Sequence, residues 1–443
     1  MRVRISRQLV RNLPPSPYFS GRYFSDVSDS PRRTLQEQGL VYNGEMSVQW
    51  RSTKSSRPPR RVIVQEESLS VQKTHKRVSE GTGLMWRGDY VNANLLLQAL
   101  KRRLDPSRPK PKIVRYNMRR KNKQEIGLND GSGRDTSDLF HQLRLRKATR
   151  ARKLEMILIP LDENHRIPLD RAPDVAEACL QVFGKVQEPY VVSLKDLLGI
   201  IGAYEWRKKG IQIPALAKQK ELLKCKYDRI HPYHGVFSPH RDDYLSLVAE
   251  TPLPSIPNVK ESEMVAYDVG TGTGVLAAIL ASRGIGEIYA VDNDHNSLDC
   301  AYDNIQRLGM LNNIEVMEGD LFPEDKSPAH LIVCNPPWLP VRPLSPIEKS
   351  VYDGDSKMLL GFLKGLRQHL AVDGEGWLIM SDFAELLNLR TRDELLEAID
   401  AAGLTVIGRH DKSPSHTKAL NEKDPLYELR RDEIVSLWRL RPH

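Results

Sequence analysis

The stretch Met264–Gly274, MVAYDVGTGTG, joins an apolar strand to a loop that contains three glycines within five residues. Glycines let the backbone turn tightly and approach a ligand without a Cβ in the way. The helix that we expect to begin at Gly274 presents free N–H groups and the positive end of its dipole to that ligand. The stretch therefore indicates a loop that binds a nucleoside-type cofactor, although dinucleotide-binding proteins have similar loops.

From Glu263 onward, strand-like and helix-like segments alternate, which is typical of a parallel sheet covered on both faces. The predicted strands are Met264–Asp268, Glu287–Asp292, Ile314–Met317, His330–Cys334, Gly376–Met380, Leu404–Arg409 and Ile434–Leu440. The predicted helices are Val275–Arg283, Ser297–Leu308, Lys357–Leu370 and Arg392–Ala402. The fold class is therefore α/β, with a seven-stranded sheet.

The spacing of Gly270, Gly272 and Gly274 is G-x-G-x-G and lacks the G-x-G-x-x-G of the usual dinucleotide fingerprint. Asp268 lies at the strand end just before this loop. A carboxylate at that position suits an ammonium group and would repel a pyrophosphate. These two features disfavour a dinucleotide such as NAD.

Two further strands are also followed by acids. Asp292, with Asn293 beside it, closes the second strand, where a carboxylate can accept hydrogen bonds from both ribose hydroxyls. Asp294 is an alternative for this role, and so is an acid that is merely solvated. Asp320, after the third strand, can bond an adenine amino group while Leu321 packs on the ring.

The most specific motif is Asn335-Pro336-Pro337-Trp338, which follows the fourth strand. The Asn335 side-chain oxygen can accept a hydrogen bond from an sp² –NH₂ group, and Pro336, which lacks an N–H, lets the loop present a carbonyl as second acceptor. Trp338 has a flat face for stacking. A Pro-Pro pair that only ends the strand is the alternative, but the position on the same sheet edge as the glycine loop favours catalysis.

These motifs resemble class I S-adenosylmethionine-dependent methyltransferases. DVGTGTGVLA, AVDNDHNSLDCAYDNIQRLG, EGDLF and LIVCNPPW are similar to the small-domain group with an NPP-aromatic motif. Within that group, they resemble HemK-type glutamine-N5 methyltransferases of release factors and ribosomal RNA guanine-N2 and adenine-N6 methyltransferases. The resemblance implies the class I, Rossmann-like fold, in which the last of seven strands is antiparallel.

The same resemblance implies roles for particular residues. Asn335–Trp338 would hold the substrate amine. The cofactor contacts would be Asp268, Gly270, Thr271, Gly272, Gly274, Asp292, Asn293, Asp320 and Leu321. Residues 235–244 are similar to the segment that covers the cofactor in these families, which makes Phe237 and Arg241 candidate contacts. Trp338 departs from the family, because the related enzymes have Tyr or Phe there.

Composition divides the rest of the chain into candidate domains. We expect a mitochondrial transit peptide or a basic tail at residues 1–25 and a linker at 26–80. A mainly helical accessory domain is expected at 81–210, with a basic arm at 101–150. A connector that covers the cofactor follows at 211–250, and the methyltransferase domain is expected at 251–443.

The net charge of +9 is unevenly distributed, because residues 1–250 carry +20 and residues 251–443 carry −11. Residues 101–150 contain 16 Lys or Arg against 5 Asp or Glu, which indicates either a solvated region or an RNA contact. No apolar run is long enough for a membrane span. The four scattered cysteines predict neither a disulfide framework nor a zinc site, and the His231, His234 and His240 cluster lacks a metal-binding pattern.

The sequence therefore predicts a methyltransferase that uses S-adenosyl-L-methionine to modify a planar amide or exocyclic amino nitrogen of a macromolecule. A protein glutamine is slightly favoured, and an adenine-N6 or guanine-N2 base of RNA or DNA is the alternative. A catalytically silent relative that serves as an assembly or RNA-binding factor is a third interpretation. The expected location of the protein is mitochondrial, otherwise cytoplasmic.

Overall fold

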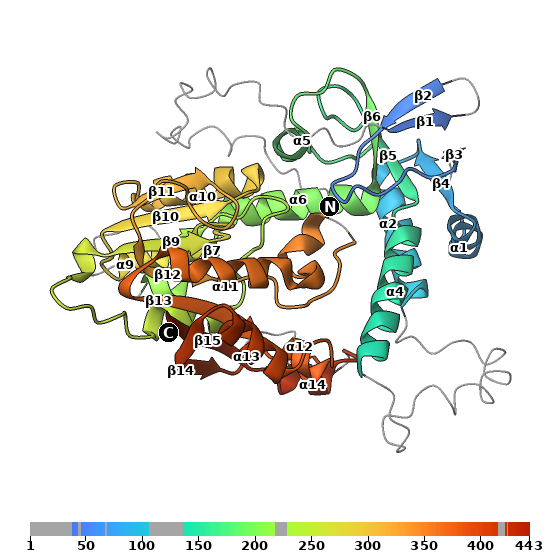
Figure 1. Cartoon of the computed structure of the whole chain (residues 1–443). Coiled ribbons are helices and arrows are strands. Elements are labelled where there is room, and N and C mark those ends of the chain that lie inside the picture. The colour runs from blue at the N-terminus through green and yellow to red at the C-terminus, as the bar shows by residue number, and fades with distance from the viewer. Residues whose placement is uncertain are drawn as a thin grey trace, which may run out of the picture.

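The computed structural model describes two α/β domains, joined by a long helix, α6 (Leu194–Lys209) (Figure 1). The described residues are 38–42, 46–66, 69–105, 136–217, 228–344, 346–414, 421–422 and 424–443. The predicted transit peptide, residues 1–25, and residues 106–135 of the predicted basic arm lie outside them.

The C-terminal domain contains the seven predicted strands in one sheet, in the order β11-β10-β9-β12-β13-β15-β14. The strands are β9 (Val265–Val269), β10 (Glu287–Asp292), β11 (Ile314–Glu318), β12 (Ala329–Cys334), β13 (Leu370–Ser381), β14 (Leu404–Lys412) and β15 (Val435–Pro442). The last strand, β15, pairs antiparallel with both β13 and β14. This topology confirms the predicted α/β class I methyltransferase fold.

Helices cover both faces of this sheet, because successive strand residues point to opposite sides and both sides are apolar. One face packs against α8 (Asp242–Glu250), α9 (Val275–Ser282) and α10 (His295–Leu308). The other packs against α11 (Lys357–His369) and α13 (Arg392–Ala401). Two shorter helices, α12 (Phe383–Leu386) and α14 (Tyr427–Arg431), flank the carboxyl end of β13 and the approach to β15.

The order of the strands reverses between β9 and β12, which are parallel neighbours. In open α/β sheets, ligands bind beyond the carboxyl ends of the strands at such a reversal. The register pairs Cys334 with Val269, the last residues of the two strands. The glycine loop, Gly270–Gly274, and the acceptor loop, Asn335–Trp338, therefore begin at the same level of the sheet.

The N-terminal domain differs from the prediction, because it is built on a six-stranded mixed sheet and is not mainly helical. Its order is β1-β2-β6-β5-β4-β3. The strands are β1 (Gln38–Tyr42), β2 (Met46–Trp50), β3 (Arg61–Gln65), β4 (Thr82–Trp86), β5 (Ile157–Leu161) and β6 (Tyr190–Ser193). Three of these strands, β1–β3, lie in the range that was predicted to be linker, so the domain begins well before Gly81.

Helices complete the N-terminal domain: α1 (Val71–Ser79), α2 (Tyr90–Arg103), α4 (Thr136–Leu154) and α5 (Ala176–Phe183). Its main core packs residues of α2, α5 and α6 against β4–β6. Asp89 caps α2 by accepting a hydrogen bond from the Asn92 N–H at 3.2 Å. A short hairpin, β7 (Ile211–Gln212) with β8 (Arg229–Ile230), leads to the C-terminal domain. No helix among the described residues is long and apolar enough to cross a membrane.

Helix α4 also contacts the C-terminal domain, near α12 and α14 (Figure 1). Its Phe140 is 5% exposed and packs in an apolar cluster with Leu339, which directly follows the acceptor loop, and with Phe383. Arg144 donates to the Arg342 carbonyl at 2.7 Å and to the Glu348 carboxylate at 2.8 Å. The accessory domain therefore packs against the segment that follows the acceptor loop in the sequence.

Replacing Phe140 with alanine should lower the free energy of unfolding by about 3 kcal/mol, because it removes a buried ring and leaves a cavity at the domain contact. Urea denaturation would measure the change. Leu145→Ala on the same helix is the matched control, since Leu145 is 68% exposed and should change stability by less than about 0.5 kcal/mol. Equal effects of the two substitutions would contradict the docking of α4.

Candidate active site

Asp268, at the carboxyl end of β9, has one carboxylate oxygen without a partner among the described residues. Its Oδ2 accepts hydrogen bonds from Thr271 Oγ1 at 2.7 Å and from the Ala277 N–H at 3.0 Å. Its Oδ1 is buried and unpartnered. Burial raises the pKa of Asp268 to about 6, since the charged form loses its hydration. This free buried acceptor fits the ammonium group of the methionine part of S-adenosylmethionine.

The glycine loop has a backbone shape that only glycine adopts readily. Gly270, Gly272 and Gly274 have φ values of 71°, 55° and 78°. The N–H groups of Gly270 and Thr271 both donate to the Val291 carbonyl at 2.9 Å, which ties the loop to β10. A Cβ on Gly270 would lie only 2.5 Å from Met358 Cε, so the glycine also lets α11 approach.

Asp292 connects the glycine loop to the next strand end. Its Oδ2 accepts from the Gly272 N–H at 3.0 Å and its Oδ1 from the Asp294 N–H at 3.0 Å. A carboxylate has about four lone-pair positions, so two remain for ribose hydroxyls. Asn293, beside it, is exposed. The structure therefore brings the predicted ribose acceptor to the glycine loop.

Asp320 and Leu321 lie at the neighbouring strand end. The Gly319 N–H donates to the Asp292 carbonyl at 3.1 Å, which holds the segment next to the ribose acceptor. Asp320 is exposed, and Leu321 has a φ of 74°. A Cβ on Gly361 of α11 would lie 2.6 Å from Leu321 Cδ1, so this helix packs closely against the leucine. Both residues are near the site, and their contacts with adenine remain predictions.

The connector before α8 runs over the glycine loop. Asn304 of α10, which is fully buried, accepts from the His231 N–H at 2.7 Å and donates to the Thr273 carbonyl at 3.0 Å. Val236 Cγ1 lies 3.9 Å from where a Gly272 Cβ would be. The adjacent Phe237 is 38% exposed, and its contact with the cofactor remains a prediction. The connector is therefore in position to cover the cofactor.

The acceptor loop forms an internal hydrogen bond that the motif alone did not predict. The Trp338 Nε1–H donates to Asn335 Oδ1 at 2.9 Å. Pro336 is buried, while Asn335, Pro337 and Trp338 are half-buried. The oxygen that we expected to receive the substrate amine therefore already has one partner, and its second lone pair remains for the substrate.

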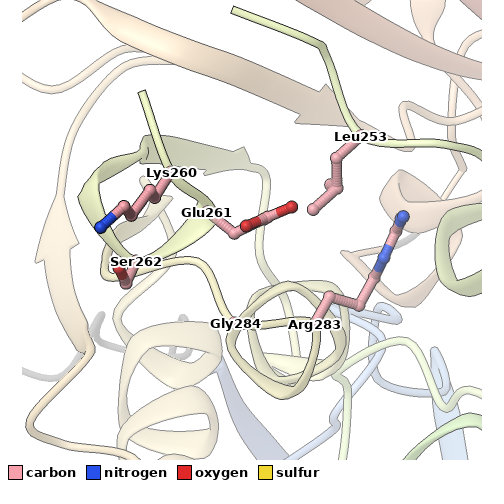
Figure 2. Close-up of a pocket in the computed structure, with 6 residues that line it drawn as sticks. All are labelled: Leu253, Lys260, Glu261, Ser262, Arg283 and Gly284. Carbon is pink, nitrogen blue, oxygen red and sulfur yellow. The ribbon is translucent and has the colours of Figure 1, made fainter. Parts of the chain in front are cut away.

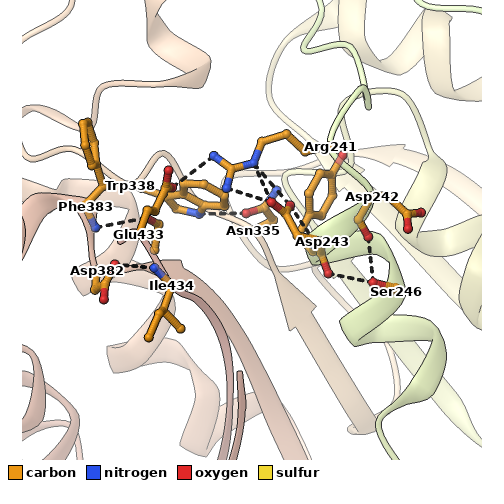
Figure 3. Close-up of polar contacts among 12 residues, drawn as sticks. Arg241, Asp242, Asp243, Ser246, Asn335, Trp338, Asp382, Phe383, Glu433 and Ile434 are labelled. Atoms are coloured by element: carbon orange, nitrogen blue, oxygen red, sulfur yellow. Dashed lines mark hydrogen bonds and ion pairs between the residues drawn. The ribbon is translucent and has the colours of Figure 1, made fainter. Parts of the chain in front are cut away.

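Arg241 lies over the Trp338 ring, with its guanidinium carbon 4.7 Å from the ring centroid (Figure 3). Its Nη2 pairs with Asp243 at 2.8 Å and its Nη1 with Glu433 at 3.1 Å. The sequence resemblance makes Arg241 a candidate cofactor contact, which stays a prediction, and the structure pairs its guanidinium with two carboxylates against the acceptor loop. Glu433 was missed, and nothing in its polar surroundings in the sequence indicated this role.

The other candidate features lie elsewhere or have other partners. A surface pocket of about 500 Å³ is lined by Leu253, Lys260, Glu261, Ser262, Arg283 and Gly284 (Figure 2). These residues precede β9 or follow α9, at the amino ends of the strands, opposite the glycine loop. His231 Nδ1 bonds the Arg207 carbonyl at 2.6 Å, and no group of metal-binding side chains occurs in the described parts of the chain.

Residues 228–397 match the family model described as "Methyltransferase small domain". This match covers 170 of the 443 residues and most of the C-terminal domain, so this domain is similar in sequence to methyltransferase domains. S-adenosylmethionine is the cofactor of the methyltransferases that this domain resembles, and the donors and acceptors around Asp268 and Asp292 fit that molecule.

Similar curated proteins include methyltransferases with protein and RNA substrates in their names. A "Ribosomal protein L11 methyltransferase" of Exiguobacterium sibiricum is 36% identical over 83 residues, 19% of this chain and 26% of that protein. A "tRNA1(Val) (adenine(37)-N6)-methyltransferase" of Parabacteroides distasonis is 38% identical over 74 residues, 16% and 31% respectively. A "Release factor glutamine methyltransferase" of Buchnera aphidicola is 31% identical over 100 residues, 22% and 36% respectively. The chain thus spans about a quarter to a third of the length of these relatives.

The raised pKa of Asp268 predicts a pH dependence of cofactor binding. The ammonium group favours the ionised carboxylate, so binding below the pKa of about 6 must displace a proton. The affinity for S-adenosylhomocysteine, which retains the ammonium group, should therefore fall about tenfold from pH 7 to pH 5. Calorimetric titration at each pH would measure it.

Asp268→Asn should bind more weakly and lose the pH dependence, because the amide does not titrate. Asp320→Asn is the matched control and should keep it, since that side chain is exposed and lies at the adenine end of the expected site. An affinity of the unmodified protein that stays flat between pH 5 and pH 7 would show that Asp268 does not contact the ammonium group.

Proposed function

We propose that this chain is an S-adenosylmethionine-dependent N-methyltransferase that acts on a planar amide or exocyclic amino nitrogen of a macromolecule. The observation that carries the proposal is the pairing of the last residues of β9 and β12, Val269 and Cys334. Because of this pairing, the loop that contains Asn335 and the glycine loop begin at the same edge of the sheet. When bound, S-adenosylmethionine supplies an electrophilic methyl group. The chain then has only to hold a nitrogen lone pair in line with it.

The acceptor loop can hold that nitrogen by two hydrogen bonds. One N–H of the substrate donates to the free lone pair of Asn335 Oδ1, and a second donates to a backbone carbonyl presented by the proline pair. This leaves the nitrogen lone pair directed at the cofactor side of the loop. Positioning at near-attack distance removes much of the entropic barrier, and the nitrogen can lose its proton once transfer has begun.

The bond from Trp338 to Asn335 makes this arrangement specific. An indole N–H can donate only to the oxygen of the amide, so it determines which end of the Asn335 side chain faces the substrate. Phe has no donor at all and the Tyr hydroxyl is at a different position on the ring. The tryptophan is therefore suited to orient the asparagine before the substrate binds.

Replacing Asn335 with alanine should lower kcat at least a hundredfold, because the nitrogen loses its oriented acceptor. The affinity for S-adenosylhomocysteine should change by less than about twofold, since no cofactor contact is removed. Transfer of tritiated methyl groups to acid-precipitable material and calorimetry would measure the two effects. Asn312→Ala, at an exposed site far from the loop, is the control. Unchanged transfer by Asn335→Ala would overturn the role of the acceptor loop.

Among acceptors, we favour a protein glutamine amide, with a nucleobase nitrogen of RNA as the second candidate. Motif similarity to the glutamine methyltransferases supports the first. The observation that favours the second is a basic groove of about 760 Å³ lined by α1 and its flanking residues and by the end of α2. Lys73, Lys76 and Arg103 line it. The pKa of His75, also in the groove, is lowered mainly by burial and further by the positive charge of nearby Lys153. Only one acid, Glu80, lines the groove among the described residues.

If RNA contacts the basic groove, the double substitution Lys73→Glu with Lys76→Glu should weaken binding about tenfold or more and reduce the salt slope by about 1.4, since each lost phosphate contact on a single strand removes about 0.7. Fluorescence anisotropy with a labelled 20-nucleotide RNA at several salt concentrations would measure both. Arg166→Glu with Lys185→Glu, two exposed sites in the same domain, is the charge-matched control. Equal losses for both pairs would indicate net charge alone.

Residues 1–25 lie outside the described residues, and we propose a mitochondrial location only from their composition. A catalytically silent relative would bind RNA or a partner without transferring methyl groups. The transfer measurement on the unmodified protein distinguishes that interpretation from the enzyme.

A further inference from the structure

One face of the Trp338 ring is covered by Arg241. The guanidinium carbon lies 4.7 Å from the centroid of the indole ring. The half-buried Trp338 side chain also packs against the two apolar cores on either side of the sheet. Its N–H is occupied by Asn335 Oδ1. The aromatic residue of the acceptor loop is thus engaged by the protein itself.

Arg241 is held in this place from two directions. Asp243, 2% exposed, pairs with its Nε and Nη2 and also accepts a hydrogen bond from the Tyr244 N–H at the start of α8. Glu433, also 2% exposed, pairs with Nη1 and accepts from Ser381 Oγ at 2.7 Å, at the end of β13 (Figure 3). The guanidinium therefore joins α8 to the β13–β15 edge across the top of Trp338.

Moving Arg241 aside would leave both buried carboxylates without their cation. Breaking a buried ion pair by removing one partner costs a factor of roughly 150 to 4,000 in an equilibrium constant. Stacking one base on an aromatic side chain gains only about 5- to 150-fold. The smallest loss equals the largest gain, so stacking of a base does not favour displacement of Arg241.

A primary amide does not need the ring face. It requires only two hydrogen-bond acceptors at one nitrogen, and the pair proposed above does not require Trp338 to leave Asn335 or Arg241. We infer that the acceptor is a side-chain primary amide of a protein, and that Arg241 is a specificity-determining residue that excludes nucleobases. This inference rests on the proposed transfer to nitrogen.

The test uses the full chain with tritiated S-adenosylmethionine and an extract of cells whose own gene for the protein has been deleted, so that acceptor sites are unmodified. Labelled material is divided and treated with either protease or nuclease. We expect protease alone to destroy the acid-precipitable label. Acid hydrolysis of the labelled protein should release volatile tritiated methylamine, because hydrolysis of an N-methylated amide frees its amine.

Label that nuclease destroys would overturn the inference while leaving the proposed methyltransferase intact. Protein label that acid hydrolysis does not release as a volatile amine would overturn it too, since the acceptor would not be an amide. No label in any fraction would overturn the transfer itself, and this inference with it.

A pair of variants tests the role of Arg241 directly. Arg241→Ala uncovers the ring, so the ratio of RNA label to protein label should rise at least tenfold over that of the unmodified protein. Arg409→Ala is the matched control, because Arg409 also lies over a tryptophan, Trp438, at 4.8 Å and pairs with an acid, Asp411, but lies away from the acceptor loop. A ratio unchanged in Arg241→Ala, in protein whose circular dichroism and cofactor affinity are normal, would overturn the exclusion.

Discussion

The parallel pairing of β9 with β12 is the constraint on which the rest of the site depends. Because side chains alternate across a sheet, a slip of one residue would move every apolar side chain of β12 to the wrong face, and both faces here are covered by helices. The register that buries Cys334 beside Val269 also brings the two loops to one level. Asp268 and Asn335, 67 residues apart in sequence, therefore open onto the same edge of the sheet.

The accessory domain is connected to both loops, although it contains none of the predicted catalytic residues. On the cofactor side, the connector reaches the glycine loop through Asn304, which bonds both His231 and Thr273. On the acceptor side, α4 places Phe140 and Arg144 against the segment that follows Trp338. The pairing of β9 with β12 brings the loops together, and these two contacts keep each loop in its place from outside the sheet.

The strands of the C-terminal sheet could be predicted because buried parallel strands appear in the sequence as short apolar runs between helices. That the last strand is antiparallel followed from the family resemblance. The N-terminal sheet could not be predicted. Its strands have only four or five residues, and β2 pairs with β6 across about 140 residues, Gln49 opposite Tyr190. Glu433 was missed for a similar reason, since its partner Arg241 is 192 residues away and no local pattern indicates such a pair.

The same limitation explains why the acceptor could not be inferred from the motif. Tryptophan at position 338 differs from the Tyr or Phe of the related enzymes. The consequence of this difference depends on Arg241, which reaches the ring only in the folded chain.

The basic groove and the amide acceptor are also compatible, because they lie near opposite ends of α4. Phe140 and Lys153 are 13 residues apart on this helix, about 20 Å at a rise of 1.5 Å per residue. A protein substrate carried on RNA could contact the groove with its RNA while its amide nitrogen reaches the acceptor loop, so basic charge in the accessory domain does not by itself identify the methylated group.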